Sequence, residues 1–441
     1  MMKSNRAPIA IAALVALSAC GVFKGGGGKK TPVLGERVPI LMSETDVAAD
    51  KTMNGVQILL PPAAVNAEWS QPGGSPSHSM GHPALAASPS RSWSAQIAGG
   101  TNRERLGAVP VVGDGRLYVV DVTGTVHAFS ADNGSSIWST EIAKTDKNKA
   151  ARFGGGVSYD DGRVYATDGL GDVVALDAKT GAEAWRAKPG GPLRGSPAIS
   201  NGNLYVVSQD NQLYALAETD GTVSWTSSAS LESQGVFGVA APAAAQGTVV
   251  AGFSSGELNA YRYENGRSLW QDALSRTTIS TSVSSLADID ANPVIDQGRV
   301  YAVGQGGRMV SLDLTTGQRV WEQNFAGLST PWVVGEWVYV VTDESKLLCI
   351  ARGNGKIRWI SQLPAYRKVE KKKHPIMWFG PILAGGKLWL TNSDGQLVAV
   401  LPGDGSMAQT LEGKEPFSMP PIVANNTLYT LDQKGRITAW R

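Results

Sequence analysis

Two histidines and two aspartates have the spacing of metal ligands. His78 and His82 lie four residues apart in His-Ser-Met-Gly-His, but no carboxylate or cysteine is nearby and the chain has only four histidines. Asp288 and Asp290 offer the oxygen ligands that calcium prefers, yet no glycine-bearing ligand loop accompanies them. These few ligands favour incidental loop residues over a metal site, so we expect neither a metal nor a cofactor.

No catalytic set is recognisable either. Cys349 stands in the apolar stretch Leu347–Ile350, which is typical of a buried and inert thiol. No Ser/His/Asp or Cys/His set has a motif around it, and no phosphate-binding glycine loop with a following lysine is present. We therefore expect no catalytic residue.

Cys20 is the one residue with a clear chemical context. Lys3 and Arg6 precede an apolar run of nine residues from Ile9 to Leu17, which is too short to span a bilayer but fits an export signal. The run ends in Leu17-Ser18-Ala19-Cys20, which resembles a bacterial lipobox. This resemblance implies that residues 1–19 are removed and that Cys20 is lipidated.

Composition narrows the class of protein that carries this signal. The chain has 441 residues, is 42% hydrophobic, and contains 52 glycines and 23 prolines. This predicts many turns, few helices and a large core, and it excludes global disorder. The net charge is only +2, so we expect no nucleic-acid partner.

A repeat with a fixed frame predicts the fold. Six tryptophans each follow a glycine by four residues, and five of the six positions 28 residues before them are proline. An aromatic residue lies eight positions after the start of nearly every copy. The tryptophans are Trp138, Trp185, Trp225, Trp270, Trp321 and Trp359. Each copy contains three or four short β-prone runs separated by turns, and recurrent tryptophans most often pack between neighbouring units.

The last copies indicate how the repeats close. A seventh copy starts at Pro381 and has Gln409 at the tryptophan position. The eighth, from Pro421, ends at Arg441 before its final strand, whereas Arg91–Ile97 is an isolated strand with Trp93 before the first copy. We therefore predict an all-β chain with an eight-bladed β-propeller of four-stranded antiparallel blades. The N-terminal strand completes the C-terminal blade, which a solenoid would not require.

The remaining segments divide the chain into three parts. Residues 1–19 are the expected signal peptide, 20–90 a lipidated tether and irregular arm, and 91–441 the propeller. Gly25–Gly28 and the two lysines after it are typical of a flexible tether. Ser70–Ser90 is dense in Ser, Pro and Gly, and we expect it to lie irregularly on the main domain.

The repeat resembles that of pyrroloquinoline-quinone-type propellers. Leu176–Trp185 and Leu312–Trp321 carry the resemblance, which implies the fold and says little about function. Quinoprotein dehydrogenases share it, but their alcohol-oxidising members carry a disulfide between adjacent cysteines, and Cys349 stands alone. The chain more closely resembles the BamB family of outer-membrane assembly lipoproteins in its lipobox, length and blade count.

Two motifs carry this second resemblance to specific residues. Leu193-Arg194-Gly195 precedes Pro197, and Asp288-Ile289-Asp290 precedes Pro293. The resemblance implies that Leu193, Arg194, Asp288 and Asp290 contact BamA, the barrel-inserting subunit. All four fall in connections between blades.

The function that these features favour is a non-enzymatic scaffold. We expect a lipid-anchored protein on the periplasmic face of the outer membrane that binds BamA, with unfolded outer-membrane proteins as further candidate partners. A quinoprotein-type dehydrogenase and a glycan- or peptidoglycan-binding propeller remain alternatives. The Lys-rich segment 367–373 is expected to be a solvated loop, with attraction to an acidic protein or lipid surface as the alternative.

Overall fold

The propeller belongs to one compact unit of the chain, residues 45–441. The structure, a computed structural model, describes residues 47–101, 103–144, 152–193, 195–231, 240–274 and 287–441. Cys20 and Arg194, two of the predicted site residues, lie outside the described residues. Across the described ranges, no helix combines the length and apolar character that crossing a bilayer requires.

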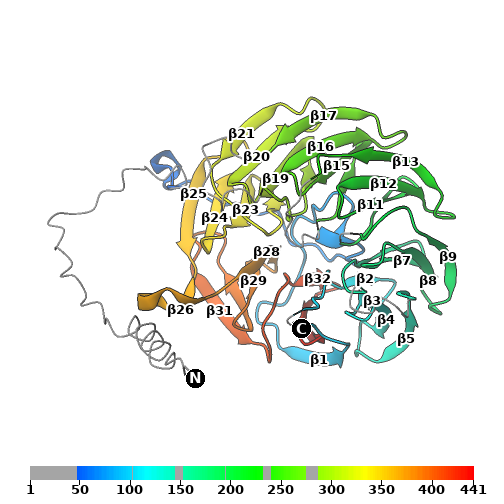
Figure 1. Cartoon of the computed structure of the whole chain (residues 1–441). Helices are drawn as coiled ribbons and strands as arrows, with labels where there is room; N and C mark the ends of the chain where they lie inside the picture. Colours follow the sequence, from blue (N-terminus) through cyan, green and yellow to red (C-terminus); the bar gives the residue numbers. More distant parts are fainter. Residues whose placement is uncertain (1–46, 102, 145–151, 194, 232–239, 275–286) are drawn as a thin grey trace, which may run out of the picture. The chain divides into compact units, whose positions relative to one another are not determined.

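Eight four-stranded antiparallel sheets form a propeller, as the repeat predicts (Figure 1). The first four blades contain β2 (Val111–Gly113), β3 (Arg116–Val120), β4 (Thr125–Ser130) and β5 (Ser136–Glu141); β6 (Val157–Asp160), β7 (Arg163–Thr167), β8 (Val173–Asp177) and β9 (Glu183–Ala187); β10 (Ala198–Ser200), β11 (Asn203–Val207), β12 (Gln212–Ala217) and β13 (Val223–Ser228); and β14 (Ala243–Ala245), β15 (Thr248–Gly252), β16 (Glu257–Arg262) and β17 (Ser268–Ala273).

The second four blades complete the ring. They contain β18 (Val294–Asp296), β19 (Arg299–Gly304), β20 (Arg308–Asp313) and β21 (Arg319–Gln323); β22 (Trp332–Val334), β23 (Trp337–Val341), β24 (Lys346–Ala351) and β25 (Ile357–Gln362); β28 (Trp378–Ala384), β29 (Lys387–Asn392), β30 (Gln396–Val400) and β31 (Met407–Glu412); and β32 (Ile422–Ala424), β33 (Thr427–Leu431), β34 (Arg436–Trp440) and β1 (Arg91–Gln96). A small extra sheet, β26 (Tyr366–Lys368) with β27 (Lys373–Pro375), stands between blades 6 and 7.

The frame tryptophans join each blade to the next, which confirms the packing role expected for them. Each indole N–H donates to a backbone carbonyl of the following blade at 2.8 to 3.2 Å, as in Trp270 Nε1 to Leu314 O. The same indole covers the frame glycine of that blade. At Gly317, which has φ +72°, an added Cβ would lie 2.5 Å from Trp270 Cγ. The glycine therefore supplies both the turn conformation and the space for the tryptophan.

The N-terminal strand closes the ring as predicted. β1 pairs antiparallel with β34, with Trp93 opposite Ala439 and Gln96 opposite Arg436. Trp93 donates to Ala131 O of blade 1 at 3.2 Å, so it takes the tryptophan position that the last copy lacks. Closure in this way leaves none of the eight blades with an incomplete sheet.

The segment before β1 runs around the inside of this ring. We call residues 64–85 the strap; Ala64 and Pro83 form a parallel bridge that closes it into a loop. It bonds to all eight blades in ring order, through Asn425 N to Asn66 O, Trp69 N to Val112 O, Tyr159 N to Ser70 O, Ile199 N to Gln71 Oε1, Ala244 N to Pro76 O, Ile295 N to Ser77 O, Trp332 Nε1 to Gly81 O and Gly385 N to Pro83 O, at 2.7 to 3.0 Å.

The sequence predicted an arm that lies irregularly on the domain, whereas the strap follows a defined path with hydrogen bonds to every blade. It contains the 3-10 turn η3 (Pro72–Gly74), whereas the other described turn of this region, η2 (Lys51–Met53), precedes it. Trp69 is 2% exposed and stacks on Trp332 with ring centroids 6.1 Å apart. In Figure 1 the strap is the blue segment near the centre of the ring.

Candidate partner-binding face

The connections between blades share one face of the ring with the turns between the second and third strands. Their backbones are bonded together: Gln209 N donates to Pro192 O at 2.8 Å, Gln305 N to Asp288 O at 2.9 Å, and Gln433 N to Pro416 O at 2.9 Å. We call this the connection face. Both motifs that resemble BamA contacts lie on it, in different connections.

Leu193 anchors the connection from blade 2 to blade 3. It is 1% exposed, forms a bridge with Ser208, and packs in a hydrophobic cluster with Tyr165 and Val206. Thr167 Oγ1 donates to Gly195 O at 2.7 Å and fixes the other side of the motif. Leu193 therefore holds its connection in place and is not available as a surface anchor in this conformation.

The connection from blade 4 to blade 5 has the same design. Asp288 is 1% exposed and Ile289 is fully buried, where its side chain fills the space over Gly252. Asp290 is half-buried and accepts a hydrogen bond from Gln305 Nε2. Of the three predicted contact residues that the structure describes, Asp290 is the one with an exposed part.

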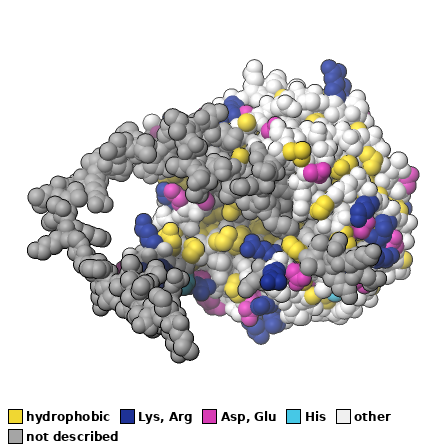
Figure 2. Space-filling view, in the orientation of Figure 1, with side chains coloured by type: hydrophobic (Ala, Val, Ile, Leu, Met, Phe, Trp, Pro, Cys, Tyr) yellow, Lys and Arg dark blue, Asp and Glu magenta, His cyan; other side chains and the backbone are white. Residues whose placement is uncertain are grey.

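A central cavity of about 350 Å³ joins this face to the strap. Trp69, Pro72 and His78 of the strap line it from within the ring, and Asp290 and Gln305 lie among its other lining residues. Hydrophobic side chains gather near the centre of the face seen in Figure 2. The strap and the blade connections therefore form a cup, and Asp290 stands on its wall.

The histidines and the cysteine have structural roles. His78 Nδ1 donates to Pro293 O at 2.6 Å, and burial lowers the pKa of this imidazole to about 4. His82 bonds Pro61 O and Gly386 N at 2.7 and 2.8 Å. Burial raises the pKa of the Cys349 thiol to about 12, as expected for an inert thiol. Within the described ranges, no three ligand side chains are grouped to hold a metal.

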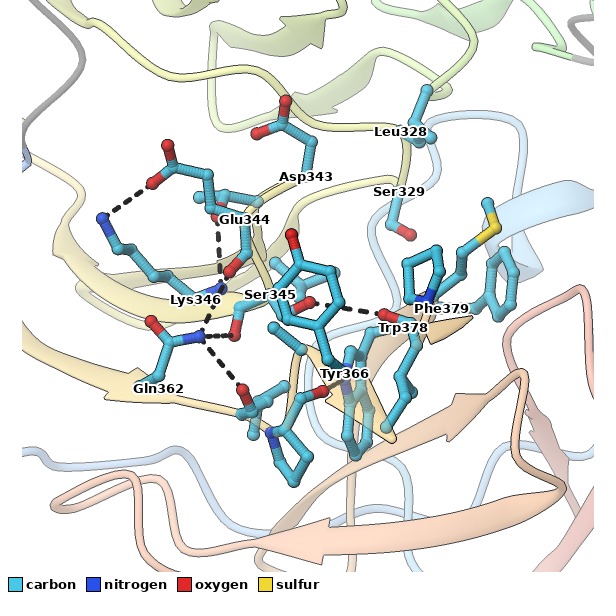
Figure 3. Close-up of a pocket in the computed structure, with 18 of the residues that line it drawn as sticks. Leu328, Ser329, Asp343, Glu344, Ser345, Lys346, Gln362, Tyr366, Trp378 and Phe379 are labelled. Atoms are coloured by element: carbon cyan, nitrogen blue, oxygen red, sulfur yellow. Dashed lines mark hydrogen bonds and ion pairs between the residues drawn. The ribbon is translucent and has the colours of Figure 1, made fainter. Parts of the chain in front are cut away.

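A larger groove of about 800 Å³ lies between blades 6 and 7 (Figure 3). For the segment beside it, the sequence indicated a solvated loop, with attraction to an acidic protein or lipid surface as the alternative. Gln362 Nε2 donates to Glu344 O and Ser345 O and fixes one wall. In Figure 3 the Tyr366 ring stands among the lining residues, with this wall on one side and Phe379 on the other. The 22-residue spacing from Trp359 to Pro381 was the available sign of an extra element here.

Charge in this groove is mixed. Lys346 pairs with Glu344 at 2.7 Å. Burial, with a smaller effect of the neighbouring Glu344, raises the pKa of Asp343. The Lys-rich segment is ordered as β26, the short turn η5 (Val369–Lys371) and β27. Tyr366, Val369 and Pro375 of this hairpin line the groove. The exposed lysines of the hairpin, which we call the rim, are their neighbours in the chain.

Comparison with known proteins agrees with the propeller fold. A family model described as "Outer membrane protein assembly factor BamB" matches residues 84–150 and 123–361. The BamB of Escherichia coli K12 is 31% identical over 393 residues, covering 79% of this chain and 88% of the relative. That of Yersinia pestis is 28% identical over 361 residues, covering 80% and 89%.

Solved structures show the same fold. BamB from Moraxella catarrhalis superposes with a TM-score of 0.69 at 19% identity, covering 80% of this chain and 99% of that one. The quinohemoprotein alcohol dehydrogenase of Comamonas testosteroni reaches 0.64 at 14% identity, covering 90% and 82%. At these identities the likeness concerns the fold alone, whereas the sequence relatives are named as assembly factors and not as enzymes. The chain belongs to the BamB family of outer membrane protein assembly factors.

Proposed function

We propose that this chain is a lipid-anchored scaffold that binds BamA through its connection face and supports the folding and insertion of outer-membrane β-barrel proteins. Cys20 would hold it on the periplasmic side of the outer membrane. Several acyl chains on one cysteine suit stable anchoring, because a single chain gives only marginal membrane binding. Unfolded β-barrel proteins are further candidate partners of the same scaffold.

The observation that supports this proposal best is that described residues of both predicted contact connections are anchored in the domain. Leu193 is anchored under one connection, and Asp288 and Ile289 are anchored under the other. Rigid loops bind partners with a smaller loss of conformational entropy. The two connections lead into blades 3 and 5, which are separated by one blade, so a single partner can reach both.

The structure changes which residues should be tested. Truncating Leu193 or Asp288 removes a buried group, so a loss of binding would not distinguish contact from folding. Asp290 has an exposed part, and Arg194 is the remaining residue of the predicted set. These two are the informative positions.

The test is co-purification of BamA from outer membranes with Arg194→Ala/Asp290→Ala. We expect binding to weaken by about 1–4 kcal/mol, which is typical when interface anchors are truncated, with an unchanged melting temperature. The matched control is Asp132→Ala/Arg262→Ala, which alters exposed charges at the opposite face. Undiminished BamA recovery with the first variant would reject this surface. Cys20→Ser protein that still sediments with membranes and still carries the mass of the lipid would reject the anchor.

A further inference from the structure

Exposed apolar side chains cluster in the groove between blades 6 and 7, whereas elsewhere on the ring they are scattered. Ile137, Val223, Leu269 and Val320 are exposed on four different outermost strands, each one or two residues before a frame tryptophan. In contrast, four exposed apolar residues line this one groove: Leu328 at 39%, Val369 at 73%, Met377 at 49% and Met407 at 53%. Clustered exposed apolar surface in a concave site is typical of a binding site.

The rim of the groove carries an excess of positive charge. Lys368, Lys371, Lys372 and Lys373 are exposed, and within the described chain no ion pair involves any of them. Arg367 pairs with Asp394, and Lys346 on the opposite wall pairs with Glu344. Among the groove lining and the hairpin, the carboxylates outside these ion pairs are Asp343 and Glu370, so the four lysines outnumber them.

The rim also offers backbone edges. β26 and β27 form a sheet of only two strands, in which Tyr366 pairs with Pro375 and Lys368 with Lys373. No third strand covers either edge in the described part of the chain. An extended segment can add to such an edge through main-chain hydrogen bonds, while its alternate side chains point to opposite sides.

We propose that this groove is a docking site for an extended acidic segment of a partner protein, in which carboxylates alternate with apolar side chains. The apolar side chains enter the groove beside Met377 and Tyr366, and the carboxylates face the lysines of the hairpin. Successive side chains of an extended strand point to opposite sides, so an alternating sequence places its apolar side chains on one side and its carboxylates on the other. This arrangement matches an apolar groove with a basic rim. The site lies at blades 6 and 7, so it goes beyond the contacts proposed at the connections into blades 3 and 5.

The experiment measures the fluorescence anisotropy of labelled peptides with the purified full chain carrying Cys20→Ser. One peptide alternates Glu with Val and Phe, and a second replaces each Glu by Lys. The rim variant is Lys368→Glu/Lys371→Glu/Lys372→Glu/Lys373→Glu. The matched control, Lys179→Glu/Lys188→Glu/Lys414→Glu/Lys434→Glu, makes the same change in net charge at exposed lysines that neither line the groove nor belong to the hairpin. Leu328→Ser/Met377→Ser tests the apolar part.

We expect the acidic peptide to bind and the basic peptide not to bind. The rim variant should weaken binding about tenfold or more, since exposed ion pairs are weak singly but four are removed together. The apolar variant should also weaken binding, the control should not, and added salt should reduce binding because exposed charges are screened.

Three results would overturn the proposal. In the first, the wild-type chain does not bind the acidic peptide. In the second, the rim and control variants bind it equally well. In the third, the same lysines bind vesicles that contain anionic lipid, whereas the peptide does not bind. Circular dichroism of each variant checks that the fold is retained. BamA recovery by the rim variant is expected to be normal, so failure here is distinguishable from failure of the BamA interface.

Discussion

At the scale of single residues, the frame glycines and tryptophans explain why the repeat is so regular. Gly317 lies under Trp270, and the same arrangement recurs at Gly134 under Trp93 and at Gly405 under Trp359. Each tryptophan needs both a carbonyl acceptor and a neighbour without a side chain. A glycine and a tryptophan in different blades are therefore selected together, although they are about 47 residues apart in the sequence at this junction.

Two glycines of blade 5 allow this explanation to be tested. Gly317 has φ +72° and no room for a Cβ, whereas Gly298 has φ +73° and nothing within 4 Å of the same position. Both Gly→Ala variants suffer the cost of the left-handed conformation, about 1 kcal/mol. Gly317→Ala should lose a further 1–3 kcal/mol or so from the clash with Trp270. Urea unfolding of both variants measures the difference, and equal losses would contradict the packing role.

His78 makes the strap sensitive to acid. Its pKa is lowered to about 4 because burial disfavours the charged form, while the bond to Pro293 O acts in the opposite direction. Below pH 6.5, the pKa of this histidine in the unfolded chain, the unfolded chain binds a proton that the folded chain does not bind. The free energy of unfolding therefore falls as the pH falls from 6.5 to 4, by up to about 3 kcal/mol from this residue.

The variant His78→Gln removes that proton uptake. The difference in unfolding free energy between the wild type and the variant should therefore be larger near neutral pH than near pH 4, by about that amount. Denaturant unfolding at the two pH values measures it, and taking the difference cancels the other titrating groups. A difference that is independent of pH would show that His78 is not buried in its neutral form.

At the scale of elements, the ring was predictable from sequence and the strap was not. Strand positions followed from a frame that repeats in eight copies, and even the missing final strand was recognisable through Trp93. The strap has no period, because its backbone and polar side chains bond to a different blade every few residues. Ser, Pro and Gly in such a segment are typical of a loose arm, and no local signal indicates that Trp69 lies inside the ring.

The candidate site shows the same limit. The motifs at Leu193 and at Asp288–Asp290 were placed in the correct connections, yet their short length could not reveal that Leu193 and Asp288 are buried. The lysines of 367–373 indicated a solvated segment, and their exposure agrees with that. The groove beside them depends on Leu328 and Met407, which lie about 40 residues away on either side, so local pattern could not predict it.

The strap's contribution to stability can be measured by truncation. A chain that begins at residue 63 keeps the strap, and one that begins at residue 90 loses it. The first loses mainly exposed contacts, such as Lys356 with Asp50, and should melt almost normally. The second loses Trp69, His78 and the acceptors for blade amides. It should lose at least about 3 kcal/mol, as for emptying a single buried tryptophan site. Similar melting temperatures for the two chains would mean that the strap is dispensable.

At the scale of the whole molecule, stability depends on the ring being closed. Every junction but one is joined by a tryptophan, and the exception is the junction from blade 7 to blade 8, where Gln409 occupies that position. Blade 8 is also where the two ends of the propeller meet: Ser90 and Arg441 exchange backbone hydrogen bonds at 2.5 and 2.8 Å. The last blade is thus held by strand pairing and by Trp93 packing on blade 1.

Replacing residues 91–97 by a Gly/Ser segment of equal length tests this closure while the strap remains covalently attached. The replacement removes the pairing with β34 and the contacts of Trp93 with Ala131 and Tyr429. It leaves β34 as an open edge, and such edges promote aggregation. We expect a loss of at least about 3 kcal/mol, the cost of emptying a buried aromatic site, together with oligomers in light scattering. The control replaces Tyr366–Pro375 in the same way, because that hairpin lies outside all eight blades. If the two replacements melted alike and both stayed monomeric, the ring would not depend on its N-terminal strand.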